Sequence, residues 1–483
     1  MSTATSNQNP FENIPSTKAK TLRINLNPNI YGTFAEIGAG QETARQFFRA
    51  GGASGTIAKA MSAYDKSFSD AIYGVEEDGR YVTQARLKRM LAHEMQLVEE
   101  RISRENNPDY LFFSFANTVA TIDFSKRYKG HGWIGIRFQL DPKQKEFDEI
   151  VLHIRFKQTE ARLQQETLGT LGVNLIYGAF FKNHKPKKLL KYLYDHIDKD
   201  TIEIDMVNFT GPHFKEVDNR LMSLQLIRND MTDAVMFGPD GNNLLPASVL
   251  YKKNILALRG SFRPVTKVNM DMFQKSYDIF IREQTVEYEN TIVVFEITLS
   301  NLKASGEIDE QDFMDRAELL SSLGHTVLIS KFQEYYKLVE YFNNYTKAKI
   351  GLTMGVNNLV DVFDEKYYRD LSGGILEAFG KLFFKDLKVY LYPMKDVATG
   401  QIMTSNNVKV HPRMKELYKF FKYNGKVMDI IDYDPDIMDI FSREVLKRIT
   451  TGEDGWEEML PEGIAEMIKE KQLFTRKLLP EKA

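Results

Sequence analysis

The last third of the chain alternates short apolar runs with longer amphipathic segments, and this pattern limits the folds open to it. Strands that alternate with helices favour parallel βαβ units joined by right-handed crossovers. The expected strands are Thr291–Leu299, Thr326–Ser330, Lys349–Met354 and Leu387–Tyr392. We therefore predict an α/β fold that ends in a parallel-sheet, Rossmann-like domain over residues 286–400.

A mixed α+β region precedes that domain. Three β-rich runs joined by short polar connections predict an antiparallel meander, and they span Leu111–Asp123, Gly132–Gln139 and Glu149–Phe156. We expect five parts: a flexible arm (1–20), a helical Gly-rich region (21–108), a mixed domain with the meander (109–285), the parallel domain (286–400) and a helical extension (401–483).

Three shorter segments carry local expectations. Leu22–Asn27 alternates apolar and polar residues, as a half-buried strand does, whereas Thr56–Tyr64 follows a glycine cluster and is expected to be helical. Val173–Phe181 is a continuous apolar run, which we interpret as a strand.

Charge and cysteine content exclude several classes of function. Lys and Arg number 64 against 66 Asp and Glu, a net charge of -2, so no global field attracts nucleic acid or an anionic membrane. With 0 cysteines, disulfide scaffolds, iron–sulfur clusters and cysteine nucleophiles are excluded. The sequence shows neither a signal-like N-terminus nor a long apolar span. We expect a soluble cytoplasmic protein without membrane insertion, and self-association into a homo-oligomer stays open.

Polar residues follow the expected parallel strands at their carboxyl ends. In an open parallel sheet these ends converge at one edge, where ligands bind. The residues there are Asn301, Lys303, Ser330, Lys331, Asn357 and Asn358. Lysines beside serine and asparagine donors favour an anionic small molecule such as a phosphate. The alternative is that exposed loops carry these residue types without any ligand.

A second candidate is the glycine-containing turn near the N-terminus. Gly38 and Gly40 precede a helical pattern in which Arg45 lies one turn in, an arrangement that can hold a phosphate on backbone amides. The dinucleotide motif Gly-x-Gly-x-x-Gly fails at Thr43. The alternative is that the glycines allow tight turns and close helix packing.

The histidines give one candidate general base and no metal motif. His213 follows a Gly-Pro pair at a strand end and is the best-placed candidate. His131 and His153 lie on neighbouring strands of the expected meander, where they can face one another. No His-x-x-x-His spacing occurs, so we predict no metal site, and no cofactor is indicated.

Two strand ends resemble the first two motifs of the haloacid dehalogenase fold. Residues 292–302 and 326–331 match those motifs in spacing. Glu296 and Thr298 stand where that family has paired aspartates, and Thr298 cannot act as a carboxylate. We therefore do not expect that phosphatase-type chemistry.

Four segments resemble an uncharacterised family of bacterial proteins of this length, and the resemblance runs nearly end to end. They are Phe34–Tyr73, Gly132–Gln139, Asp218–Leu224 and Asp370–Phe383. Members often carry the labels nicotinate-nucleotide (or nicotinamide-mononucleotide) adenylyltransferase or TonB-dependent receptor. The first label implies nucleotidyltransferase activity through His-x-Gly-His and a later Ile-Ser-x-x-x-x-Arg-like motif, of which only fragments occur at 130–132 and 329–331.

Two function classes follow from these observations. The first is a protein that binds a phosphorylated or nucleotide-like small molecule at the carboxyl edge of the C-terminal sheet, with an unknown reaction. The alternative is a non-catalytic assembly or interaction protein built on an enzyme-like fold.

Overall fold

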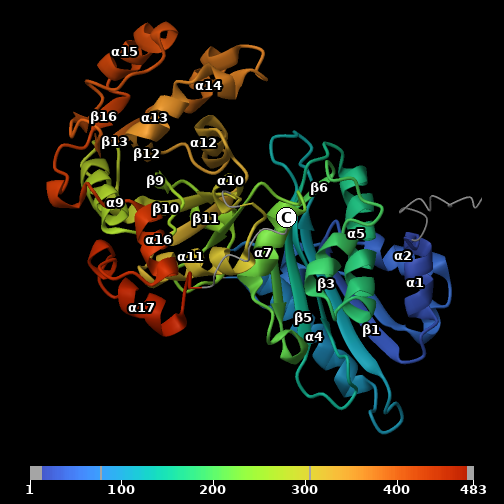
Figure 1. Ribbon diagram of the computed structural model, residues 1–483. Coiled ribbons are helices and arrows are strands. Elements are labelled where there is room, and N and C mark those ends of the chain that lie inside the picture. Colours follow the sequence, from blue (N-terminus) through green and yellow to red (C-terminus); the bar gives the residue numbers. More distant parts are fainter. Residues whose placement is uncertain (1–13, 77–78, 304–305, 476–483) are drawn as a thin grey trace, which may run out of the picture. The chain divides into compact units, whose positions relative to one another are not determined.

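The computed structural model describes residues 14–76, 79–303 and 306–475. The chain divides into two compact units, Met1–Thr232 and Asp233–Ala483, and each is built around one large β-sheet (Figure 1). This division differs from the expected boundaries after residues 108 and 285, because strands on both sides of each boundary pair with one another.

The sheet of the first unit has six strands in the order β2-β1-β3-β4-β5-β6. The strands β2, β1 and β3 are parallel, and the remaining pairs are antiparallel. The antiparallel meander expected from the sequence is therefore confirmed. The strands are β1 (Ile30–Gly38), β2 (Ile57–Ser62), β3 (Leu111–Ala120), β4 (His131–Phe138), β5 (Asp148–Phe156) and β6 (Ile202–Thr210).

Helices cover both faces of this sheet. On one face the apolar side chains of the strands pack against α1 (Thr17–Asn25), α2 (Glu42–Ala50), α5 (Ala161–Phe181) and α6 (Pro186–Tyr192). On the other face lies α4 (Gln84–Arg101), whose Leu87 and Leu91 come so close to Gly135 of β4 that a Cβ there would lie 3.1 Å from each. The other two described helices of this unit are α3 (Lys66–Tyr73) and α7 (Asn219–Arg228).

The sheet of the second unit has eight strands in the order β16-β13-β12-β9-β10-β11-β7-β8. Six of them, from β16 to β11, are parallel, whereas β7 joins β11 antiparallel and β8 pairs with β7. The strands are β7 (Ala234–Phe237), β8 (Asn243–Leu244), β9 (Asn254–Arg259), β10 (Thr291–Thr298), β11 (Thr326–Ser330), β12 (Ile350–Gly355), β13 (Lys388–Tyr392) and β16 (Val427–Asp429).

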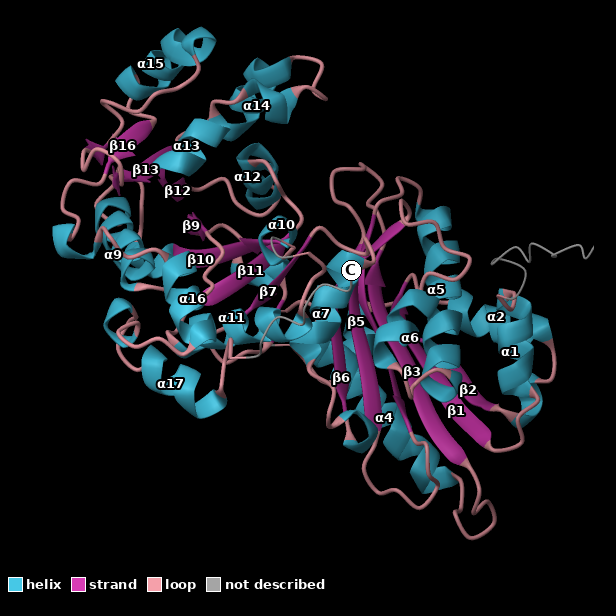
Figure 2. Ribbon diagram, viewed as in Figure 1, coloured by secondary structure: helices cyan, strands magenta, loops and turns pink. Residues whose placement is uncertain are grey.

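Counted from β9, the parallel strands follow the order 3-2-1-4-5-6, which is the doubly wound order of nucleotide-binding folds. The chain builds β10 and β11 on one side of β9 and then crosses to β12 on the other side. Helices flank both faces of the sheet (Figure 2). They are α8 (Pro246–Val249), α9 (Lys267–Phe280), α10 (Leu299–Leu302), α11 (Glu310–Ser322), α12 (Tyr335–Asn343), α13 (Val356–Val362), α14 (Gly374–Leu382), α15 (Lys415–Tyr423), α16 (Ser442–Thr451) and α17 (Ile464–Lys471).

The α/β class and the four C-terminal strands expected from the sequence are confirmed, and β10 pairs parallel with β11. The central strand β9 was not among them. It lies between β10 and β12, so these two strands are not direct neighbours. The region after residue 400 is mostly helical but also supplies β16 and a two-stranded ribbon of β14 (Met394–Lys395) and β15 (Ile402–Met403).

Three local expectations were wrong. Leu22–Asn27 belongs mainly to helix α1, which begins after Ser16, whose hydroxyl accepts a hydrogen bond from the Ala19 amide. Val173–Phe181 is the last part of α5, a helix with both polar and apolar positions buried because it packs on several neighbours. Thr56–Tyr64 contains the strand β2, whose residues alternate between half-buried and exposed.

Two further findings concern the ends of the chain and the membrane. Of the expected arm, residues 1–13 lie outside the described part, and Thr17–Lys20 form the first turn of α1 rather than an arm. Among the helices that the structure describes, none has both the length and the apolar character needed to cross a bilayer.

Candidate functional site

The carboxyl end of the second unit's sheet is closed by a buried ion pair. Arg259 ends β9 and lies in register with Glu296 on the neighbouring β10. The Arg259 Nε and Nη2 atoms donate to the two Glu296 carboxylate oxygens at 2.7 and 3.0 Å, and Glu296 is 0% exposed. Ser330, the last residue of β11, donates its hydroxyl to Glu296 Oε1 at 2.6 Å. One strand-end carboxylate therefore joins the ends of three neighbouring strands.

An aromatic ring lies over this pair. The Arg259 guanidinium carbon is 4.1 Å from the centroid of the Tyr335 ring, and Nη1 donates to the Gln333 carbonyl oxygen at 2.7 Å. The Asn358 side-chain amide donates to the Tyr335 hydroxyl at 2.8 Å. Burial raises the pKa of Tyr335, so its hydroxyl stays neutral and acts as a hydrogen-bonding group. These contacts fix the orientation of the Tyr335 ring.

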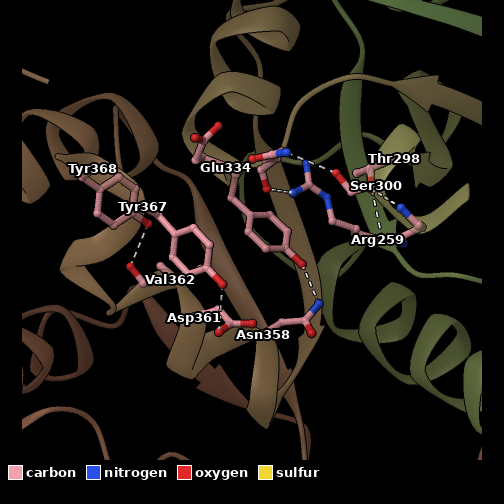
Figure 3. Close-up of a pocket in the computed structure, with 12 residues that line it drawn as sticks. Arg259, Thr298, Ser300, Glu334, Asn358, Asp361, Val362, Tyr367 and Tyr368 are labelled. Carbon is pink, nitrogen blue, oxygen red and sulfur yellow. Dashed lines mark hydrogen bonds between the residues drawn. The ribbon is translucent and has the colours of Figure 1, made fainter. Parts of the chain in front are cut away.

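Two more tyrosines stand at the opposite wall. The Tyr368 hydroxyl donates to the Val362 carbonyl oxygen at 2.8 Å, which anchors the turn that carries Tyr367. Tyr367 is 39% exposed and its hydroxyl lies 3.5 Å from Asp361 Oδ1 (Figure 3). Asp361 is exposed, so a carboxylate and an accessible aromatic ring stand side by side at this wall.

These residues enclose a pocket of about 370 Å³. It takes its lining from the segments that follow β9, β10, β11 and β12, at the point where the chain crosses from one side of β9 to the other. This crossing point is where open α/β sheets bind ligands. The lining residues are Arg259, Thr298, Ser300, Asn301, Gln333, Glu334, Tyr335, Asn358, Asp361, Val362, Tyr367 and Tyr368.

The charge of the pocket differs from the expectation of a basic edge. Arg259 is the one basic residue in that lining, and Glu296 neutralises it. The lining also holds the carboxylates of Glu334, which pairs with Lys337 at 2.8 Å, and of Asp361. The pocket therefore presents aromatic rings, amides and carboxylate oxygens rather than a surplus of positive charge.

The residues predicted at this edge divide into two groups. Asn301 and Asn358 line the pocket, and Ser330 supports its floor through Glu296. Lys331 pairs with Asp233, the residue just before the antiparallel strand β7, at 2.8 Å. Four predicted residues do not line the pocket: Ser330, which contacts it only indirectly through Glu296, and Lys303, Lys331 and Asn357.

Sequence reasoning missed Arg259, Tyr335, Tyr367 and Asp361. Arg259 follows a short apolar run directly before Gly260, and this run is the signal that could have located β9. Glu296 and Thr298, the positions compared with haloacid dehalogenases, have local partners: Glu296 binds Arg259, and the Thr298 hydroxyl accepts from the Asn301 amide at 3.1 Å to begin α10.

The glycine turn of the first unit has a close-packing role. Gly38 has a φ of +77°, and a Cβ there would lie 2.0 Å from the Val119 carbonyl oxygen on β3. A Cβ on Gly40 would lie 1.7 Å from Asn117 Oδ1. Both glycines therefore let the turn approach β3. Neither lines a described cavity, whereas Arg45 on α2 does.

None of the candidate histidines His131, His153 and His213 lines a described pocket. The His213 amide donates to Asp148 Oδ1 at 2.8 Å, and its ring packs on Phe214. His131 and His153 do face one another: Nδ1 of the first and Nε2 of the second are 3.3 Å apart, and His153 also bonds Asp205. In the part of the chain that the structure describes, no cluster of three or more His, Asp or Glu residues could hold a metal ion.

A scan against models of protein families and a search of curated proteins find no match for this chain. Among solved structures, a competence-damaged protein (CinA) superfamily protein from Enterobacter cloacae is 11% identical, with a TM-score of 0.25, and the match covers 37% of this chain and 98% of that one. A competence/damage inducible protein from Agrobacterium tumefaciens is 13% identical, with a TM-score of 0.23, over 37% of this chain and 96% of that one. At such scores the similarity assigns neither a family nor an activity.

Proposed function

We propose that the second unit binds a nucleoside-like small molecule in the pocket at the crossing point of its sheet. The observation that carries this proposal is the lining itself: an accessible tyrosine ring, side-chain amides and a carboxylate meet where four strand ends converge. Aromatic rings stack on bases, amides can hydrogen-bond base edges, and carboxylates accept hydrogen bonds from ribose hydroxyls.

The pocket has the size that such a ligand needs. Its volume of about 370 Å³ lies within the range of small-molecule sites. We assign base stacking to Tyr367 and ribose recognition to Asp361, because both side chains are accessible from solvent. The Tyr367 hydroxyl oxygen lies 3.5 Å from Asp361 Oδ1, so one ligand can contact both side chains. Arg259 and Tyr335 have mutual contacts and serve as a rigid floor.

The balance of charge favours the nucleoside part over phosphates. A phosphate needs cations or unpaired amides, and the one arginine of the lining is already neutralised by Glu296. The proposal thus narrows the anionic ligand expected from the sequence to one whose uncharged part provides most of the binding energy.

Calorimetry with adenosine, AMP and ATP tests this proposal. We expect saturable binding of adenosine, with phosphates changing the affinity by less than about threefold. Tyr367→Ala should weaken adenosine binding roughly tenfold, since base stacking contributes about 1–3 kcal/mol. Tyr423→Ala is the matched control, because Tyr423 belongs to the same unit, is 84% exposed and does not line the pocket.

Two outcomes would contradict the proposal. If ATP binds ten times more tightly than adenosine and Lys331→Ala removes the difference, the ligand is held by its phosphates outside this pocket. If none of the three ligands binds or raises the melting temperature, the non-catalytic assembly role becomes the better explanation.

A further inference from the structure

A buried carboxyl group in the first unit has an oxygen without a hydrogen-bond partner. Glu36 on β1 is 3% exposed, and its carboxyl is hydrogen-bonded by the Ala44 backbone amide in the first turns of α2. Its Oε1 atom is buried and makes no hydrogen bond within the described part of the chain. A buried oxygen in this condition is costly unless another group satisfies it.

Glu36 lies at the base of a groove between α2 and the edge strand β2. The groove has a volume of about 440 Å³ and is lined by Glu36, Gln41, Ala44, Arg45, Phe48, Arg49, Ala60, Met61 and Ser62. Its walls are mainly apolar, and Phe48 is 54% exposed. The Gln41 side-chain amide donates to the Ser62 hydroxyl at 2.9 Å and so joins the two sides of the groove.

Glu36 itself is uncharged at neutral pH, and charged residues of α2 and β2 lie around it. Burial, with a smaller contribution from the neighbouring Glu42, raises the pKa of Glu36 to about 8, so the carboxyl keeps its proton at neutral pH. On α2, Arg45 pairs with Glu42 at 2.7 Å, and Arg49 is exposed. Lys59 of β2 pairs with Glu94 at 2.6 Å. The groove therefore offers a neutral donor and two arginines in its lining, of which Arg45 is already paired with Glu42.

We propose that this groove is a second ligand site, which binds a small apolar organic acid. Arg49 holds the carboxylate, the apolar body packs against Phe48 and Met61, and the Glu36 hydroxyl donates to an uncharged oxygen at the other end of the ligand. Because the Oε1 atom is buried, it gains the partner that it lacks only when the side chains of the groove move apart to admit the ligand oxygen. The site is separate from the nucleoside pocket and does not depend on it.

Two probe acids test the donor role of Glu36. 4-Acetylbenzoate carries a carbonyl oxygen opposite its carboxylate, and 4-ethylbenzoate has nearly the same shape without that oxygen. We expect the acetyl compound to bind about three- to tenfold more tightly at pH 6.5 in titrations followed by NMR. Above pH 8 the wild type should lose this preference, because ionised Glu36 no longer donates.

Variants separate the donor from the charge. Glu36→Gln keeps a donor that does not titrate, so its preference for the acetyl compound should persist at pH 9.5. Arg49→Ala should weaken both probes about fivefold, whereas Arg101→Ala, an exposed arginine on α4, should change neither. Glu36→Leu should bind both probes equally.

The proposal is overturned by absence of saturable binding of either probe, or by equal affinities for the two probes in the wild type at pH 6.5. The second result would indicate that Glu36 donates instead to Asn117, which is its register neighbour on β3 and whose Oδ1 also makes no hydrogen bond among the described residues. Equal losses in Arg49→Ala and Arg101→Ala would show general charge attraction and would likewise refute the site.

Discussion

The two units each bury a glutamate two residues before the end of a parallel strand, yet the two carboxyl groups have different partners. Glu296 of β10 receives two hydrogen bonds from Arg259 and one from Ser330. Glu36 of β1 is bonded by one backbone amide and keeps an oxygen without a partner among the described residues. The same residue type at the same strand position is thus satisfied internally in one unit and left for a ligand in the other.

This difference indicates which side chains are free to take part in binding. A buried ion pair with further hydrogen bonds is rigid, so the Glu296 pair can shape a pocket whose binding groups are other residues. A lone buried acid retains its proton and its hydrogen-bonding capacity, so Glu36 itself can bind. Substitutions at the two glutamates and around them should therefore have unequal effects in the two units.

The largest effect is expected from removing one partner of the buried pair. Arg259→Ala leaves the fully buried carboxyl group of Glu296 without its ion-pair partner, which should lower the free energy of unfolding of the second unit by about 3–5 kcal/mol. Urea unfolding followed by circular dichroism measures the change. The double variant Arg259→Met, Glu296→Leu should recover most of the loss, and a double variant as unstable as the single one would show that the charge is not the cause.

The strand ends in the two units also differ, and this gives a second test. Gly38 ends β1 at a φ of +77°, and a Cβ added there would lie 2.0 Å from the Val119 carbonyl oxygen, whereas Gly355 ends β12 with nothing within 4 Å. Gly38→Ala should therefore lower the free energy of unfolding by about 2–4 kcal/mol. Gly355→Ala is the control and should change it by less than about 1 kcal/mol. Similar losses in both variants would remove the packing explanation for Gly38.

The C-terminal unit was predictable because its strands are short apolar runs separated by clear helices. The strand β9 (Asn254–Arg259) is also a short apolar run, but the long segment that contains α9 separates it from β10, so it lay outside the strand–helix alternation of the last third. In the first unit, Leu22–Asn27 and Val173–Phe181 were mistaken for strands. A six-residue alternation and a continuous apolar run do not distinguish strand from helix, and packing in the folded protein decides between them.

The candidate site was predicted in its position but only partly in its residues. The carboxyl edge follows from parallel topology, and Asn301 and Asn358 are found there. The direction in which Lys331 points depends on Asp233, just before the antiparallel strand β7, and no rule on parallel sheets includes that strand. Likewise Tyr367 reaches the pocket through a turn after α13, which a strand-based argument does not consider.

The third prediction concerns pH and applies to the unpaired acid. The pKa of Glu36 rises from 4.5 to about 8 on folding, so the folded state binds more protons than the unfolded state between these values. Its contribution to stability is complete below pH 4.5 and is lost as the pH rises through 8. Glu36→Gln should remove this loss, so that its free energy of unfolding exceeds that of the wild type by up to about 4 kcal/mol at pH 8. Unfolding curves at pH 5 and pH 8 measure it, and a wild-type disadvantage that does not grow with pH would contradict the assignment.

The smallest effect is expected at Lys331, which the sequence placed at the ligand and the structure places beside Asp233. The pair is partly exposed, at 38% and 53% of the two side chains, so Lys331→Ala should change the free energy of unfolding by less than about 0.5 kcal/mol. Because Lys331 is not part of the pocket lining, adenosine affinity should change by less than about twofold.

Calorimetry of adenosine binding to Lys331→Ala and to Asp361→Asn tests where the ligand binds. Asp361→Asn should weaken adenosine several-fold, since a carboxylate accepts from ribose hydroxyls more strongly than an amide does. A larger loss of adenosine affinity in Lys331→Ala than in Asp361→Asn would place the ligand beside the antiparallel strands of the sheet. The Arg259–Glu296 pair would then no longer be the floor of a site whose binding residues are Tyr367 and Asp361.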